Sequence, residues 1–420
     1  MALCVVTGVL LLLVGVAAGC GGTATVTTTS GGATVTTGAT GSTGSTAAAT
    51  GTPIKIGVLD PTTGAQTLNG TEVNTGIKLY FDSIGNQIAG HPVQLIYEDD
   101  ASNPQQGLDR ARKLVEQDKV DLLMGVVHSG VVAGVAQYAA QMKVPFIITC
   151  AGADAMTGAA RSPYVFRTAE TNSQRNQVNG WYAATKLGYK KAALFSWNFA
   201  AGQQQIAAFK KSFEAAGGAV TYSNETPLPT PDFGPYLSKV DKKNVDVIWA
   251  FYTSDDAIRF LQQLKQFGYT PGIPIVDQGS LTEDEILPQL GDNALGILGT
   301  TCYTSSLDNA VNKAFLGQYD KVASGKKPGW YSYQGYLGAM VAAASIQSLS
   351  GDLSNKDAFL KAIGDTKLDG PGGPFAFDDH GQAILNQYIV KVAKDSGGNL
   401  YHQVLETFSA VSQNWTPPAQ

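Results

Sequence analysis

The chain has 420 residues, of which 44% are hydrophobic, and its net charge is −5 at pH 7 from 29 basic and 34 acidic residues. This composition excludes an intrinsically disordered protein and predicts two or three folded domains. Lys and Arg form no run longer than a pair, so nothing in the charge pattern favours nucleic-acid binding.

The N-terminal residues predict an export signal that ends at a lipid-modified cysteine. Residues 2–18 carry no charge and have an apolar centre, and the small residues Val16-Ala17-Ala18-Gly19 precede Cys20. The pattern resembles the lipobox of bacterial lipoproteins, which implies that residues 1–19 are a signal peptide and that Cys20 carries the lipid. A transmembrane anchor is the alternative, but it needs about 20 apolar residues and this run is shorter.

A low-complexity segment follows the signal. Residues 20–52 consist almost wholly of Gly, Thr, Ala, Ser and Val. Such a segment cannot bury enough apolar surface to fold, so we expect a flexible tether. A lipid, a tether and a folded body would hold a receptor at the cell surface.

From residue 53 onward, short apolar runs alternate with segments of helical periodicity, which predicts an α/β fold with parallel sheets. We expect strands at 55–61, 93–97, 120–127, 145–149, 192–197, 245–251, 273–276 and 295–303. We expect helices at 70–84, from Pro104 onward, at 131–142, 203–216, 255–267 and 309–323, and a buried helix at 332–349. Residues 164–168 read as an extended crossing segment, 370–378 as a turn with a β segment, and 387–394 with 401–408 as a closing hairpin.

Two loops of small residues mark one half of an expected cleft. In open parallel sheets, ligands bind beyond the carboxyl ends of the strands. The third strand is followed by His128, Ser129 and Gly130, and the fourth by Cys150, Ala151, Gly152 and Ala153. Small residues let a ligand approach the backbone, and Ser129 adds a hydroxyl group. Each loop taken alone is also typical of an ordinary tight turn.

The second series of strands supplies the other half of the expected cleft. Candidate residues at or just beyond its strand ends are Phe199, Phe251, Tyr252, Gln278 and Gly279.

Several motifs in a fixed order now point to one family. They are KIGVLD, IAGHPVQLIYEDDASNP, GVVHSGV, VPFIITCAGAD, PYVFRT, GYLGAM and GPFAFD. Their order and spacing resemble the branched-chain amino acid type of ABC-transporter substrate-binding protein, over residues 54 to about 410. The resemblance implies the type I periplasmic binding protein fold, in which two Rossmann-like lobes are joined by three crossing hinge strands. Lobe 1 would comprise residues 53–168 and 302–380, and lobe 2 residues 169–301 and 381–415.

The resemblance also implies how a ligand would be held. Ser129 and residues 151–153 would bind a carboxylate from lobe 1, while Phe199, followed by Phe251 or Tyr252, would cover the ligand from lobe 2.

Two positions depart from the amino-acid pattern. Ala153 stands where relatives usually carry a hydroxyl group, and Gly279 stands where they carry the acid that pairs the ligand's ammonium. A buried ammonium without a counter-charge costs several kcal/mol. Either Asp277 or Glu283 replaces that acid, or the ligand lacks an ammonium. Amino acids and aromatic or aliphatic carboxylates therefore both remain open.

The expected function is the extracytoplasmic binding component of an ABC importer, monomeric and without a cofactor. It would be anchored through Cys20, close on a small carboxylate ligand and deliver it to permease subunits. A surface sensor with the same fold is the alternative.

A hydrolase is the alternative from another class. The sequence lacks G-x-S-x-G and phosphate-loop motifs, and no acid is placed to orient His128 beside Ser129. The histidines show no metal-ligand spacing, so we expect neither catalysis nor a metal site. Cys150 and Cys302 would meet an oxidising compartment, where a disulfide and two free thiols are both open.

Overall fold

A computed structural model describes residues 51–323 and 325–418. The predicted signal peptide, Cys20 and all of the tether except residues 51 and 52 lie outside the described residues. No helix within the described ranges is long and apolar enough to cross a membrane.

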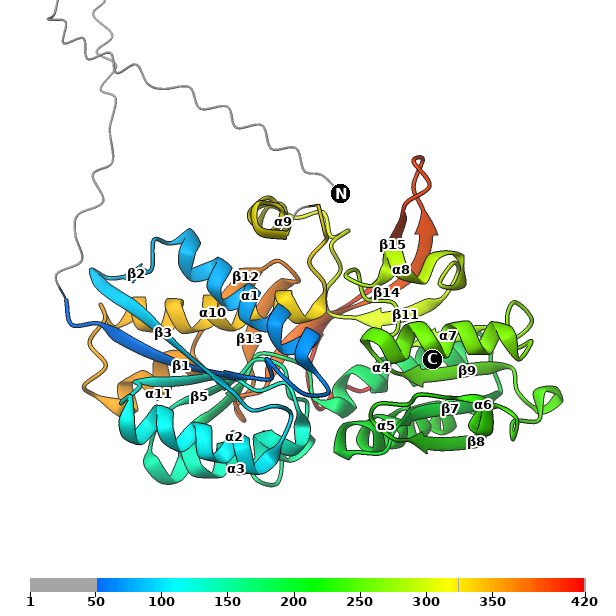
Figure 1. Cartoon of the computed structure of the whole chain (residues 1–420), viewed down its shortest axis with the longest axis horizontal. Coiled ribbons are helices and arrows are strands. Elements are labelled where there is room, and N and C mark those ends of the chain that lie inside the picture. The colour runs from blue at the N-terminus through cyan, green and yellow to red at the C-terminus, as the bar shows by residue number, and fades with distance from the viewer. Residues whose placement is uncertain (1–50, 324, 419–420) are drawn as a thin grey trace, which may run out of the picture. The chain divides into compact units, whose positions relative to one another are not determined.

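The first lobe is built on a six-stranded sheet, drawn on the left of Figure 1. Its strands, in spatial order, are β2 (Gln87–Ile88), β3 (His91–Asp99), β1 (Ile54–Asp60), β4 (Leu122–Gly125), β5 (Phe146–Ile148) and β6 (Val165–Arg167). All neighbours are parallel except β2 and β3. Successive side chains of a strand point to opposite faces, so the sheet separates two apolar cores.

Helices cover both faces of this sheet (Figure 1). The helices on one face are α1 (Thr67–Ser83), α9 (Ala310–Ala323), α10 (Trp330–Ser348) and α11 (Lys356–Gly364). On the other face lie α2 (Pro104–Arg112), which continues as a π-helical turn over Lys113–Gln117, and α3 (Ser129–Met142). Helix α2 begins as expected, because Asn103 Oδ1 accepts hydrogen bonds from the backbone N–H groups of Gln105 and Gln106 and Pro104 opens the helix.

A nine-stranded mixed sheet forms the second lobe and continues at one end into the first, where Phe375 and Phe377 pack in the core beside α10. Its strands, in spatial order, are β12 (Lys367–Gly370), β13 (Gly373–Phe377), β14 (Ala383–Lys394), β11 (Leu298–Thr301), β10 (Ile275–Asp277), β9 (Val247–Phe251), β7 (Lys191–Trp197) and β8 (Ala219–Thr226), with β15 (Leu400–Val411) paired to β14. The helices of this lobe are α4 (Asn172–Thr185), α5 (Ala200–Ala215), α6 (Gly234–Leu237), α7 (Ser254–Gln266) and α8 (Leu287–Leu290).

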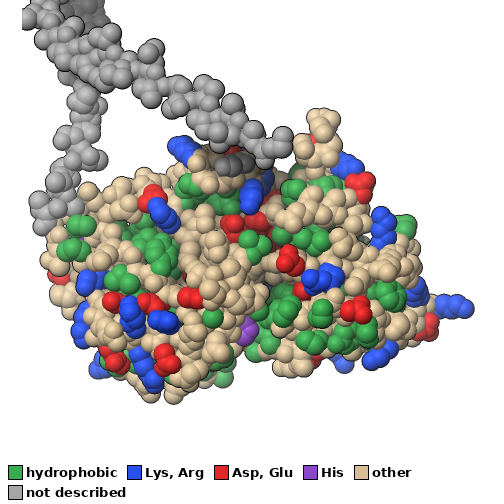
Figure 2. Space-filling model, viewed as in Figure 1, with side chains coloured by type: hydrophobic (Ala, Val, Ile, Leu, Met, Phe, Trp, Pro, Cys, Tyr) green, Lys and Arg blue, Asp and Glu red, His purple; other side chains and the backbone are tan. Residues whose placement is uncertain are grey.

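On the surface of the folded body, positive and negative side chains are interspersed over the face drawn in Figure 2.

Three crossings join the lobes, after β6, after β11 and between β13 and β14. The first crossing is pinned by Arg167, whose side chain is fully buried. Its guanidinium donates to Gln382 Oε1 beside the third crossing (2.7 Å) and to the carbonyls of Ala151 (3.1 Å) and Ala153 (2.7 Å). One side chain therefore ties two crossings to the loop that follows β5.

The expected α/β class with two lobes is confirmed, and so are the closing hairpin of β14 and β15 and the buried helix α10. The sequence interpretation missed β2, β8, β12, α4 and α11, and the short helices α6 and α8. Strand β8 alternates exposed and half-buried residues and helix α4 is rich in polar residues, so neither gives an apolar run.

A contact between the lobes links the loop before α8 to the start of α10. Glu285 Oε1 accepts a hydrogen bond from the backbone N–H of Gly329 at 2.7 Å. A side chain at position 329 would collide with this carboxyl group, so the glycine permits the contact. Burial, and then the nearby Glu72 carboxylate, raise the pKa of Glu285 to about 8.

We predict that Glu285→Gln removes a pH-dependent loss of stability. The folded-state pKa lies above the ordinary value, so the folded protein holds a proton that the unfolded chain releases, and stability falls as pH rises from about 4.5 through 8. Glutamine keeps the acceptor and cannot ionise, so the melting temperature of the variant minus that of the wild type should grow from pH 5 to 8. Asp379→Asn, at an exposed carboxylate, is the control; parallel pH profiles for Glu285→Gln and the wild type would contradict the prediction.

Candidate functional site

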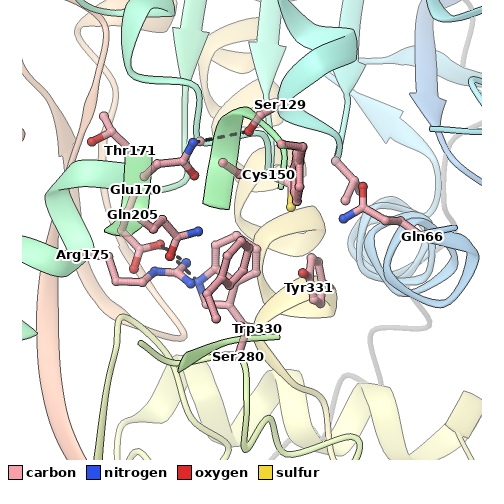
Figure 3. A pocket seen from close by; sticks show the side chains of 16 residues that line it. Gln66, Ser129, Cys150, Glu170, Thr171, Arg175, Gln205, Ser280, Trp330 and Tyr331 are labelled. Carbon is pink, nitrogen blue, oxygen red and sulfur yellow. Dashed lines mark hydrogen bonds and ion pairs between the residues drawn. The ribbon is translucent and has the colours of Figure 1, made fainter. Parts of the chain in front are cut away.

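A cavity lies between the two lobes, at the carboxyl ends of the parallel strands (Figure 3). Its volume in this closed arrangement is about 40 Å³. The lining residues are Gln66, Val127, Ser129, Cys150, Gly152, Glu170, Thr171, Asn172, Arg175, Phe199, Ala201, Gln205, Phe251, Ser280, Trp330 and Tyr331.

The lobes touch at both rims of this cavity. At one rim, Asn69 Nδ2 donates to Thr253 Oγ1 at 3.3 Å and Ser254 Oγ donates to Asn69 Oδ1 at 2.9 Å. At the other rim, the ring of His128 stacks on that of Phe199, with centroids 4.9 Å apart and planes 16° apart. The structure is therefore a closed arrangement of the two lobes.

On the lobe 1 side, hydrogen-bond donors surround the start of α3. Ser129 is the first residue of α3, and its Oγ accepts a long hydrogen bond of 3.5 Å from Asn172 Nδ2. Gly152 lies against Asn172, and a Cβ at position 152 would overlap the Asn172 side chain. The backbone N–H groups of Ser129 and Gly152 have no acceptor among the described residues. Such groups at a helix start are suited to an anion.

The floor of the cavity is a buried ion pair between Glu170 and Arg175. Arg175 Nη2 donates to Glu170 Oε2 at 3.3 Å, and Arg175 Nη1 donates to Gln278 Oε1 at 2.7 Å. Burial alone would raise the pKa of the Glu170 carboxyl, but the charge of Arg175 and the hydrogen bond from Gln387 lower it below its ordinary value. Glu170 is therefore ionised and neutralised within the wall.

Aromatic rings enclose the remaining space. Phe199 and Phe251 enter from lobe 2, with ring centroids 6.4 Å apart, and Trp330 and Tyr331 enter from the start of α10. The guanidinium of Arg175 lies over the Trp330 ring at 4.5 Å. A flat apolar ligand with one anionic end would match this combination of rings and donors.

Five of the residues expected at the site line the cavity: Ser129, Cys150, Gly152, Phe199 and Phe251. Four others do not line the cavity: His128 lies at its rim, and Gly130, Ala151 and Ala153 lie behind the lobe 1 wall. His128 Nδ1 accepts from the backbone N–H of Gly130 (3.1 Å) and so caps α3, and burial lowers the pKa of His128. The carbonyls of Ala151 and Ala153 face Arg167.

Three expected residues of lobe 2 also lie behind the wall. Tyr252 is fully buried in the lobe 2 core, with its hydroxyl 3.2 Å from Thr226 Oγ1, so it cannot touch a ligand directly. Gln278 accepts from Arg175 and therefore acts on the cavity through that residue. Gly279 has a positive φ of 111° and a backbone N–H that donates to Asp277.

Neither acid considered as a replacement counter-charge lines the cavity. The carboxylate of Asp277 accepts from the backbone N–H groups of residues 279–282 and so shapes the loop after β10. Burial, followed by the neighbouring acids, raises the pKa of Glu283 well above its ordinary value, which favours a neutral carboxyl.

The sequence interpretation missed the most polar part of the wall, which spans residues 170–175. One signal was available there. Thr171 and Gln174 have the spacing of a capping box, and the structure has both of its bonds, from Gln174 N–H to Thr171 Oγ1 (2.9 Å) and from Thr171 N–H to Gln174 Oε1 (3.2 Å). The motif predicts the start of α4, and hence that Glu170 and Arg175 flank a helix N-terminus.

The two cysteines of the described residues, Cys150 and Cys302, are free, buried thiols. Cys150 lines the cavity, whereas Cys302 accepts hydrogen bonds from Trp330 Nε1 (3.2 Å) and Gln334 Nε2 (3.4 Å). Within the described part of the chain, no group of three or more His, Cys, Asp or Glu side chains is arranged to hold a metal ion.

We predict that Glu170→Gln lowers the free energy of unfolding by about 3 to 5 kcal/mol, because it leaves the buried charge of Arg175 without its partner. Urea unfolding measures this change. Glu214→Gln, at an exposed position of α5, serves as the control. A loss below about 1 kcal/mol, the range of exposed ion pairs, would show that the pair does not hold the floor together.

Comparisons with known proteins show the family and fold of the chain. A family described as periplasmic binding protein matches residues 53–399. The chain is 30% identical to Leu/Ile/Val-binding protein homolog 6 of Brucella suis over 362 residues, 84% of this chain and 91% of that protein.

Two solved structures are also similar. An ABC transporter substrate-binding protein from Sphaerobacter thermophilus is 35% identical with a TM-score of 0.82, over 86% of this chain and 99% of that one. A solute-binding protein of an ABC transporter from Rhodopseudomonas palustris, in complex with 3,4-dihydroxybenzoic acid, is 31% identical with a TM-score of 0.81 over the same shares. The chain belongs to the periplasmic binding protein family.

Proposed function

We propose that this protein is the ligand-binding component of an ABC importer and that it captures a small aromatic carboxylate by closing its two lobes. The family implies an extracytoplasmic location, where Cys20 and residues 20–52 would tether the body to the membrane. Residues 53–168 with 302–380, and 169–301 with 381–415, are the two closing units of this proposal. A permease would then accept the ligand from the closed form.

The charge balance of the cavity carries the choice of ligand. Glu170 is the one carboxylate among the described lining residues, and Arg175 already neutralises it. A ligand ammonium would therefore lack a free counter-charge, which costs several kcal/mol in a buried site. A ligand carboxylate, by contrast, needs only hydrogen-bond donors, and the Ser129 hydroxyl and the backbone N–H groups of Ser129 and Gly152 are available to it.

The rings favour an aromatic body for the ligand. Phe199, Phe251, Trp330 and Tyr331 offer faces and edges to a planar group. The similarity to the Rhodopseudomonas palustris protein, which was solved with a dihydroxybenzoic acid, supports the same choice.

One alternative concerns the ligand and the other concerns the partner that reads the closed form. The 30% identity with a Leu/Ile/Val-binding protein homologue favours an aliphatic amino acid as the second candidate ligand. The same clamshell could also report its ligand to a receptor instead of a permease. Loss of ligand uptake on deletion of the partner permease, with ligand binding intact, would decide for transport.

We predict that benzoate-type carboxylates raise the melting temperature of the protein and that leucine, isoleucine and valine do not. A ligand that binds only the folded state at 100 times its Kd adds about 2.7 kcal/mol to the free energy of unfolding. Benzamide, which has the shape of benzoate without its charge, is the matched control and should have a much smaller effect. Stabilisation by the branched-chain amino acids alone would replace the aromatic assignment with the amino-acid one.

We further predict that Ser129→Ala weakens binding of the carboxylate by about 1 to 3 kcal/mol, because a charge-assisted hydrogen bond is lost. Isothermal titration calorimetry gives the affinity. Ser83→Ala, at the exposed end of α1, is the control and should bind as the wild type does. An unchanged Kd for Ser129→Ala would remove Ser129 from the proposed anion site.

A further inference from the structure

Gln66 is a buried polar side chain of the cavity wall that lacks a partner. It lies in the loop between β1 and α1, and the residue is 7% exposed. Its Oε1 accepts no hydrogen bond from any described residue. Figure 3 shows the side chain pointing into the cavity, from the side opposite Arg175.

Other polar side chains of the wall have hydrogen-bond partners within the protein. Gln205 Oε1 accepts from Asn176 Nδ2 at 3.1 Å, and Asn172 Nδ2 donates to Gln204 Oε1 at 2.8 Å. Both oxygens of Glu170 accept hydrogen bonds. Buried polar groups are usually paired, and Gln66 lines the cavity, so its free acceptor is available to a bound ligand.

The position of Gln66 is held by contacts between the lobes. Asn69, one turn further along α1, bonds to Thr253 and Ser254 of lobe 2. Closure therefore presents the Gln66 amide to the cavity at a defined place. The aromatic wall lies between this amide and the guanidinium of Arg175 (Figure 3).

We propose that Gln66 determines specificity, by accepting a hydrogen bond from a ring hydroxyl of an aromatic carboxylate whose acid group lies at Ser129 and Gly152. This inference rests on the proposed function and names the ring substituent. An amide offers both an acceptor and donors, which matches a phenolic hydroxyl. A methoxy group has no proton to give, so it would leave Oε1 buried and unpaired.

Calorimetric titration of the full chain tests the proposal with benzoate, 3-hydroxybenzoate, 4-hydroxybenzoate and the corresponding methoxybenzoates. The wild type should bind at least one hydroxybenzoate about tenfold more tightly than benzoate and than its methoxy counterpart, because only the hydroxyl satisfies the buried acceptor. In Gln66→Leu this preference should disappear, while benzoate still binds.

Gln205→Leu is the matched control, because Gln205 also lines the cavity but its acceptor is already paired. Whatever its effect on overall affinity, the ratio between hydroxybenzoate and benzoate should stay near the wild-type ratio. Equal binding of benzoate and both hydroxybenzoates by the wild type, or an unchanged ratio in Gln66→Leu, would overturn the inference. The methoxy comparison uses the wild type alone, so it remains a test if Gln66→Leu does not fold: equal binding of a hydroxybenzoate and its methoxy counterpart would contradict the proposed hydrogen bond. Failure of all these carboxylates to bind the wild type would instead refute the proposed function.

Discussion

The buried ion pair of Glu170 and Arg175 is the interaction on which the junction of the two lobes depends. Glu170 lies on the first crossing, and its oxygens accept hydrogen bonds from Trp330 at the start of α10 and from Gln387 on β14. Arg175 lies in α4 and donates to Gln278 beyond β10. Both lobes and two of the crossings therefore meet at one pair of charges. Neither charge is tolerable there without the other.

This pair also sets the electrostatics of the cavity. Because Glu170 is neutralised inside the wall, no free carboxylate is left for a ligand ammonium, and we propose that Ser129 and the N–H of Gly152 bind the ligand's anionic end. In the proposal, the aromatic rings select the ring of the ligand by shape, and the unpaired Oε1 of Gln66 selects a hydroxyl group on that ring. Closure brings these parts together, because they come from loops of different lobes.

The fold and the lobe 1 side of the cavity could be predicted from the sequence where the apolar pattern is strong. The alternation of strand and helix located β4, α3 and β5, and with them Ser129 and Gly152 on the cavity wall. The polar part of the site could not be found in that way. Residues 170–175 begin a helix of mixed polar residues, which becomes buried only because α5, β11, β14 and α10 pack around it. Its one local signal was the Thr171 capping box.

The sequence by itself determined the α/β class, the two-lobed family fold and the lobe 1 half of the cleft, because hydrophobic periodicity and small-residue turns act over a few residues. Only the tertiary structure decided which side chains face the cavity. Phe251 lines it and the adjacent Tyr252 does not, because successive residues at a strand end point to opposite sides. The pairing of Glu170 with Arg175 and the unpaired state of Gln66 depend on elements far apart in the chain, so no local pattern records them.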